Sequence, residues 1–174
     1  MLRVDLGRLA REGSVLVEAR VPADHRLWSG GSFQWKGPVE VRLHASYGGS
    51  GEIVARGSVS GERAEECRRC LDPVSTEVDE ELTMVFAESG SDEASDGADV
   101  YTYDPSRGVV DLAEAVREEL ILAMNPYVVC DPECRGLCPR CGANLNEGDC
   151  GCVSEEVDPR WEALRALQEH AKGR

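Results

Sequence analysis

The sequence predicts an α+β protein, in which an antiparallel β-meander precedes one helix and a cysteine-rich tail that binds zinc. Three observations predict this class: apolar and polar residues alternate through the first half, one well-bounded helical pattern follows, and eight cysteines form two groups at metal-ligand spacing. We expect a β body at 1–87, an acidic mobile loop at 88–104, and a helix plus metal-binding tail at 105–174 packed on the body.

Alternation with a period of two marks the strands of the β body. Three segments, 15–21, 39–43 and 53–59, place an apolar residue at every second position or nearly so. A fourth segment has Val78, Leu82, Met84 and Phe86 on one side, and Glu80 interrupts this row. Because short turns and no helical pattern separate these segments, we expect a meander that is either curled or closed into a barrel.

A helix follows the acidic loop, with clear start and stop signals. Asp111 is suited to cap its N-terminus, and Glu114 would complete a capping box. Pro126 disfavours helical geometry in the preceding residue, so the helix is expected to stop at Asn125. A short last helix is expected to start at Asp158, where proline follows a capping residue. The first helix has an apolar stripe of Leu112, Val116, Leu120 and Ala123, widened by Ile121 and Met124.

The cysteine spacing is the most informative chemical feature of the chain. A C-x-x-C turn lets two thiolates converge on one tetrahedral ion, and two such pairs complete a four-cysteine site. We therefore expect zinc at one or two sites, with iron as the alternative because four sulfurs suit both metals. The eight candidate ligands are Cys67, Cys70, Cys130, Cys134, Cys138, Cys141, Cys150 and Cys152.

One grouping of these thiols is favoured. The last four cysteines lie close enough in sequence to form a local site, and the first four would form a second site that ties the β body to the tail. Exchange of pairs between the two sites stays open at this stage. Four thiolates leave no open position for a catalytic water, so the expected role of the metal is structural.

The charge balance disfavours a protein that coats nucleic acid. The formal net charge is −14, whereas broad binding to nucleic acid rests on neutralising phosphates with Lys and Arg. A basic protein partner fits better, and direct contact with RNA is expected to be weak. Four arginines beside the cysteines either offset thiolate charge or contact RNA phosphate or a partner's carboxylates; these are Arg68, Arg69, Arg135 and Arg140.

Signals for membrane insertion and for catalysis are poor. No apolar run approaches the length of a membrane span and no signal-like segment opens the chain, so we expect a cytoplasmic protein with reduced thiols. No phosphate-binding glycine loop or triad of catalytic residues stands out, so we expect no small-molecule substrate and no enzyme activity. One catalytic alternative is thiol–disulfide exchange at Cys67 and Cys70, whose neighbouring arginines favour a thiolate.

Three motifs, in order along the chain, resemble those of a known family. The first is Cys67-Arg68-Arg69-Cys70-Leu71, and the second runs from Asp111-Leu112 to Asn125-Pro126. The third starts at Cys134-Arg135-Gly136-Leu137, passes through Asn144-Leu145-Asn146, and continues to Asp158-Pro159-Arg160. Together they resemble the YceD family, the bacterial large ribosomal RNA subunit accumulation proteins.

The resemblance implies a non-enzymatic role in the synthesis, processing or accumulation of the large-subunit (23S) ribosomal RNA, within ribosome biogenesis. It supplies no catalytic residues. Combined with the acidic composition, it makes a basic large-subunit ribosomal protein or an rRNA-processing enzyme the expected partner. The alternative is a zinc-stabilised protein-binding module with a non-ribosomal client.

Overall fold

The computed structural model describes residues 1–30, 34–49, 51–91 and 100–152. They contain a five-stranded sheet of order β2-β3-β4-β5-β6. The predicted antiparallel meander is confirmed for four consecutive strands, β2 (Ser14–Val21), β3 (Val39–Tyr47), β4 (Ile53–Glu66) and β5 (Pro73–Glu88). The fifth strand, β6 (Val100–Tyr103), pairs in parallel with the end of β5.

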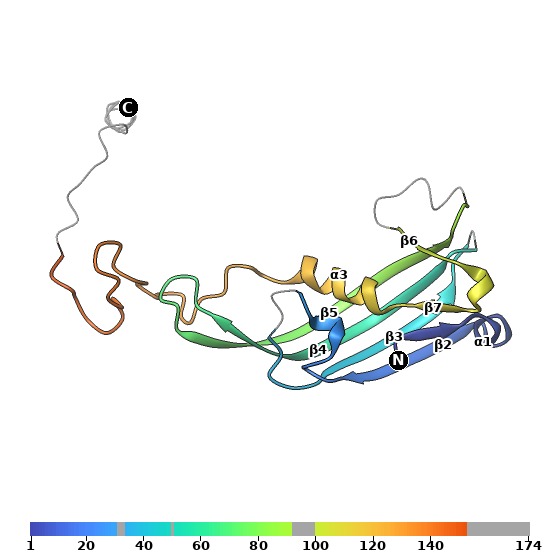
Figure 1. Ribbon diagram of the computed structural model, residues 1–174, viewed down its shortest axis with the longest axis horizontal. Coiled ribbons are helices and arrows are strands. Elements are labelled where there is room, and N and C mark those ends of the chain that lie inside the picture. The colour runs from blue at the N-terminus through green and yellow to red at the C-terminus, as the bar shows by residue number, and fades with distance from the viewer. Residues whose placement is uncertain (31–33, 50, 92–99, 153–174) are drawn as a thin grey trace, which may run out of the picture.

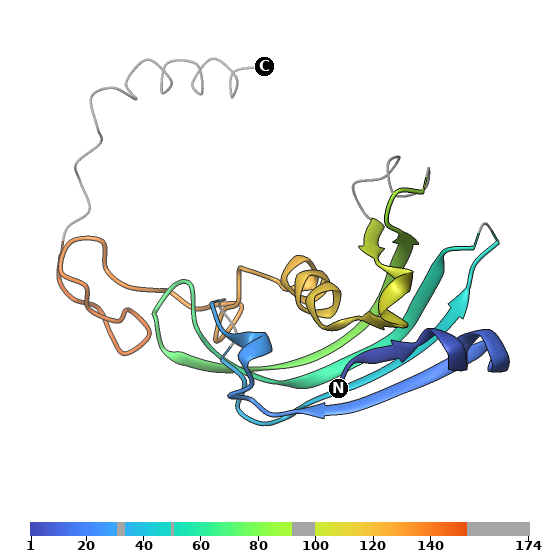
Figure 2. The same cartoon turned by 45° about the vertical axis from the view of Figure 1, so that its right-hand side comes forward.

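A second layer lies inside the curve of this sheet (Figures 1 and 2). It consists of helix α3 (Ala113–Ala123) and a two-stranded antiparallel ribbon of β1 (Arg3–Asp5) and β7 (Val109–Asp111). Helix α1 (Leu6–Glu12) follows β1, and 3-10 turns η1 (Arg26–Trp28) and η2 (Pro105–Arg107) lie in the connections. Among the described helices, none has the length and hydropathy needed to cross a membrane.

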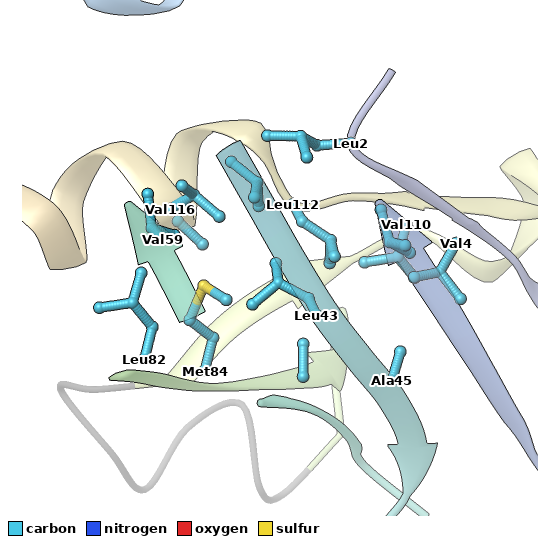
Figure 3. Packing of buried hydrophobic residues seen from close by; sticks show 14 of the residues in the cluster. Leu2, Val4, Leu43, Ala45, Val59, Leu82, Met84, Val110, Leu112 and Val116 are labelled. Atoms are coloured by element: carbon cyan, nitrogen blue, oxygen red, sulfur yellow. The ribbon is translucent and has the colours of Figure 1, made fainter. Parts of the chain in front are cut away.

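The core fills the space between the inner face of the sheet and this second layer. Figure 3 shows Leu43 and Met84 of the sheet directed toward Val116 of α3, with Val110 of the ribbon beside them. Leu43 and Val116 are fully buried. The alternation predicted from the sequence therefore identified the face of β2–β5 that packs on the core.

The sheet does not close into a barrel, which settles the alternative left open above. Strands β2 and β6 lie at opposite edges, and no strand in the described part of the chain joins them. Instead, α3 covers the concave face and buries Leu112, Val116 and Leu120 there. Alternation along a strand reports which face is buried and leaves open whether a helix or more sheet covers it.

Helix α3 begins later than predicted. Asp111 is the last residue of β7, where pairing with Arg3 holds it extended, and Leu112 occupies the cap position. The Asp111 carboxylate still accepts the N–H of Ala113 at 3.1 Å, as a capping residue would. The helix ends before Asn125 as predicted, but Ile121 is 45% exposed and does not widen the buried stripe.

Two expectations concern residues that the structure describes only in part or not at all. Residues 92–99 of the predicted acidic loop and the helix predicted from Asp158 onward lie outside the described residues. Within the range 88–104, Val100–Tyr103 form β6. The division of the chain at residues 87 and 104 stays a prediction.

Gly57 provides a test of how closely β3 and β4 approach. It pairs with Leu43, its φ is +152°, and a Cβ at this position would overlap the carbonyl oxygen of Arg42. We expect Gly57→Ala to lower the free energy of unfolding by about 2–4 kcal/mol, because backbone on a central strand cannot move aside. The measurement is denaturant-induced unfolding.

The matched control is Gly49→Ala, because a Cβ at Gly49 would meet no atom within 4 Å. It should change the free energy of unfolding by less than about 0.5 kcal/mol. Equal effects of the two substitutions would contradict the close approach at Gly57.

Candidate metal centres

The first four cysteines converge at the turn between β4 and β5. Cys67 and Cys70 lie in this turn, Cys130 and Cys134 follow α3, and the four Sγ atoms lie within 4.8 Å of one another. The Sγ–Sγ distance is 3.8 Å between Cys67 and Cys134 and 3.5 Å between Cys70 and Cys130. A tetrahedral zinc site with Zn–S bonds of about 2.3 Å has edges of about 3.8 Å, so this first cluster fits a metal ion.

The first cluster is largely shielded from solvent and receives hydrogen bonds to sulfur. Of its four thiols, only that of Cys130 is exposed. The backbone N–H of Arg69 donates to Cys67 Sγ at 3.4 Å, and the side-chain amide of Asn146 donates to Cys134 Sγ at 3.3 Å. Such bonds stabilise thiolate charge and orient the ligands, as partners of metal ligands commonly do.

The second cluster is local and more exposed. The Sγ atoms of Cys138, Cys141, Cys150 and Cys152 also lie within 4.8 Å of one another, in a loop that follows the first cluster. Cys138 is buried, Cys150 is half-buried, and the other two are exposed. The structure thus brings the cysteines together in the two groups that their spacing favoured.

Both C-x-x-C turns have the same backbone arrangement. The N–H of Leu71 donates to the carbonyl of Cys67 at 3.0 Å, and the N–H of Gly142 donates to that of Cys138 at 2.9 Å. The residue after the second cysteine is left-handed in each, with φ of +64° at Leu71 and +73° at Gly142. Glycine adopts this conformation freely, whereas leucine pays about 1–2 kcal/mol for it.

Each cluster contains one thiol with a lowered pKa. Burial raises the pKa of Cys67, but backbone N–H groups, that of Cys70 foremost, outweigh this effect and lower it to about 6. The N–H of Cys141, with other donors, lowers the pKa of Cys138 to about 6. At neutral pH each cluster therefore offers one thiolate, which is the form that binds metal.

Other thiols of the two clusters have raised pKa values. Hydrogen bonds with Cys141 and Cys150 raise the pKa of Cys152 to about 12. The N–H of Asp72 lowers the pKa of Cys70, but burial and the Asp72 carboxylate, whose Oδ2 lies 3.1 Å from the sulfur, outweigh it and raise the pKa overall. A second thiolate is costly beside the first, and a bound divalent cation removes this cost.

Arg69 holds the tail against the turn that carries Cys67 and Cys70. Its Nη1 donates to the carbonyl oxygens of Pro132 at 3.0 Å and Cys134 at 2.9 Å. Its own carbonyl accepts the N–H of Leu137 at 2.9 Å. Gly136, with φ of +75°, lies so close that a Cβ would come within 2.9 Å of the Arg69 carbonyl oxygen. This turn therefore requires glycine.

Two asparagines link the clusters, a role that was not expected from the sequence. Asn144 Nδ2 donates to Asp72 Oδ2 at 3.1 Å, which connects the second cluster's loop to the β4–β5 turn. Asn146 accepts the N–H of Arg135 at 2.7 Å and donates to Cys134 Sγ. The available signal was the Asn-x-Asn pattern, because asparagine side chains satisfy backbone groups in turns.

The other candidate arginines are also engaged within the chain. Arg68 Nε donates to the carbonyl of Pro126 at 2.9 Å, and Arg135 Nη2 pairs with Asp149 Oδ1 at 2.6 Å. Arg140 also interacts within the chain. Arg68 and Arg69 thus bind the backbone of the segment that leads to and carries the tail cysteines, and the two roles expected from the sequence stay predictions.

Comparison with known proteins agrees with the motifs. Residues 55–168 match the family model described as large ribosomal RNA subunit accumulation protein YceD, and this span contains both clusters. The chain belongs to the YceD family. The resemblance noted from the sequence is therefore confirmed. No solved structure matches this YceD protein.

Several curated relatives align with this YceD protein. An uncharacterized protein of Mycobacterium tuberculosis is 34% identical over 114 residues, which cover 64% of this chain and 54% of that protein. The large ribosomal RNA subunit accumulation protein YCED homolog 1, chloroplastic, of Arabidopsis thaliana is 34% identical over 74 residues, or 42% of this chain and 23% of that one. The chain spans about half the length, or less, of these curated relatives.

Metal removal should act on the tail before the sheet. We expect chelation to speed amide hydrogen exchange at least about tenfold across 130–152 while β2–β5 stay protected, because the tail has few apolar contacts of its own. The second cluster should lose metal first, since two of its thiols are exposed. Hydrogen exchange with parallel metal analysis measures both effects.

A matched pair of variants separates the two clusters. Cys134→Ser should free the whole tail, whereas Cys141→Ser should free only the loop of the second cluster and leave 130–137 protected. Unchanged exchange at 130–152 after verified metal loss would contradict a structural role for the metal.

Arg69 should matter for docking the tail more than its neighbour does. Arg69→Lys removes the guanidinium that bridges two carbonyl oxygens, and we expect the docked state of 130–137 to weaken by about 1–2 kcal/mol. Arg68→Lys, which removes one exposed hydrogen bond, should change it by less than about 0.5 kcal/mol. Amide exchange rates of 134–137 report both values, and equal protection in the two variants would argue against this role of Arg69.

Proposed function

We propose that this YceD protein acts, without catalysing a reaction itself, in the accumulation of 23S ribosomal RNA during ribosome biogenesis in the cytoplasm. The observation that carries the proposal is the family match over 55–168. The relatives from Arabidopsis thaliana and maize are named for accumulation of the large ribosomal RNA subunit.

The charge of the chain supports action through a protein partner and disfavours non-specific binding to RNA. With 33 acidic residues against 19 Lys and Arg, the chain has a net charge of −14, which disfavours broad contact with phosphates. Arg68, Arg69 and Arg135 already bond to carbonyl or carboxylate oxygens of the chain itself. A basic large-subunit ribosomal protein or an rRNA-processing enzyme has the complementary charge.

Zinc is the metal that the two clusters suit best. Each offers four sulfurs within 4.8 Å of one another, and four thiolates would leave no open coordination position, which is the pattern of structural zinc sites. A bound divalent ion would offset two of the four thiolate charges in each cluster, and in the first cluster it would cross-link the β4–β5 turn to the tail. Iron fits four sulfurs as well, and elemental analysis of native protein distinguishes the two.

The burial of the first C-x-x-C pair argues against thiol–disulfide exchange. The exposed fractions of Cys67 and Cys70 are 0% and 4%, so an external disulfide has no line of approach to either sulfur. A redox-active cysteine needs a low pKa and also solvent access, and Cys67 has only the first. The remaining alternative is a zinc-stabilised binding module whose client is not ribosomal.

Depletion of the protein tests the process directly. We expect a selective fall in the ratio of 23S to 16S ribosomal RNA, restored by the intact gene and by Arg68→Lys. The double variant Cys67→Ser/Cys134→Ser should not restore it, because the tail is then undocked. Northern analysis gives the ratio, and proteins that co-purify at native levels separate a ribosomal from a non-ribosomal client. An unchanged ratio after complete depletion would refute the proposed role.

A further inference from the structure

Strand β5 has an edge whose backbone is unpaired, among the described residues, over most of its length. It runs from Pro73 to Glu88, but β6 pairs only with its last part, Val85–Glu88. Residues 73–84 pair with β4 on one side, and no described segment pairs with their backbone on the other. Figure 1 shows the β4–β5 hairpin extending well beyond β6. Such an edge presents a row of N–H and C=O groups to which another strand can add.

The outer face along this edge carries three carboxylates of β5 that have no ion-pair partner among the described residues. Glu77, Asp79 and Glu81 are exposed and alternate along β5, so their carboxylates lie on one face. None of the three forms an ion pair with another described residue. Glu62 of β4 lies directly across from Glu77, and two like charges in this position cost stability. Glu62 forms an ion pair with Lys36, whereas Glu77 has no such partner among the described residues.

The other half of the same outer face is organised differently. On β2 and β3, Glu18 pairs with Arg42 at 3.3 Å and Arg20 pairs with Glu40 at 3.2 Å. Charge is thus balanced across β2 and β3, although β2 is the edge strand on the other side of the sheet, and it is unbalanced on β5. The contrast points to a binding partner that would supply the missing cations.

We propose that the edge of β5 over residues 73–84 binds an extended, Arg- or Lys-rich segment of a protein partner as an added strand. This deepens the proposed function and rests on it for the class of partner. Backbone hydrogen bonds would give affinity, and alternate cationic side chains would face Glu77, Asp79 and Glu81. A second copy of the chain would place like charges together at this edge, and RNA would bring phosphates to it, so neither fits.

A designed peptide tests this mode with the full-length protein. The probe is a fluorescent 12-residue peptide of alternating arginine and threonine, and its matched control carries N-methyl groups at alternate residues. We expect the first peptide to bind and to slow amide exchange in 73–84. The methylated peptide has the same charge but lacks the backbone N–H groups that would hydrogen-bond to β5, so it should bind at least about tenfold more weakly.

Charge variants locate the site. Glu77→Gln/Asp79→Asn/Glu81→Gln should weaken peptide binding about tenfold, whereas Glu12→Gln/Glu114→Gln/Glu133→Gln, with the same change in net charge, should weaken it less than about threefold. Equal binding of the two peptides, or binding without slowed exchange at 73–84, would overturn strand addition. Slowed exchange there on raising the protein concentration alone would show a second copy as the occupant and also overturn it.

The same two triple variants distinguish this inference from the proposed function in cells. We expect the variant at Glu77, Asp79 and Glu81 to fail to restore the ratio of 23S to 16S ribosomal RNA while its control restores it. If both restore the ratio, the edge is not the partner's site although the role in ribosomal RNA stands. If depletion leaves the ratio unchanged, the proposed function fails whatever the peptide does.

Discussion

The convergence of four thiols at the β4–β5 turn is the interaction on which the rest of the tail depends. Cys67 and Cys70 lie in the turn that joins two strands of the sheet, whereas Cys130 and Cys134 follow α3. The apolar contacts around these sulfurs are few, and the residues packed there are Val74, Val129 and Leu137. Burial on this scale does not fix a loop, so the order of the tail rests on the sulfurs and on the carbonyls that Arg69 binds.

That arrangement makes the second cluster dependent on the first. The segment from Leu137 to Cys152 meets the β4–β5 turn through short polar contacts, such as those of Asn144 with Asp72 and of Leu137 with Arg69. These contacts exist only while Cys134 and Gly136 hold the chain beside the turn. The hairpin thus supports the tail, and the orange segment that carries the tail cysteines lies beside its tip (Figure 2).

The features that the sequence predicted correctly are those determined by residues close together in the chain. Alternation identified β2–β5 and their inner face, and cysteine spacing favoured the two groups that the structure brings together. Ribbon strands β1 and β7 have three residues each, too few for a pattern, and the parallel return of β6 is a long-range pairing. Asn144 and Asn146 act across the turn on Asp72 and Cys134, contacts that no periodicity reveals.

The separation of the two halves of the first cluster along the chain has a consequence during synthesis on the ribosome. Cys67 and Cys70 leave the exit tunnel about 60 residues before Cys130 and Cys134, a delay of roughly 3–12 seconds at ~5–20 residues per second. Until then the hairpin tip carries two thiols without their partners. A metal ion bound by all four sulfurs of this cluster would therefore require that Cys134 has already emerged.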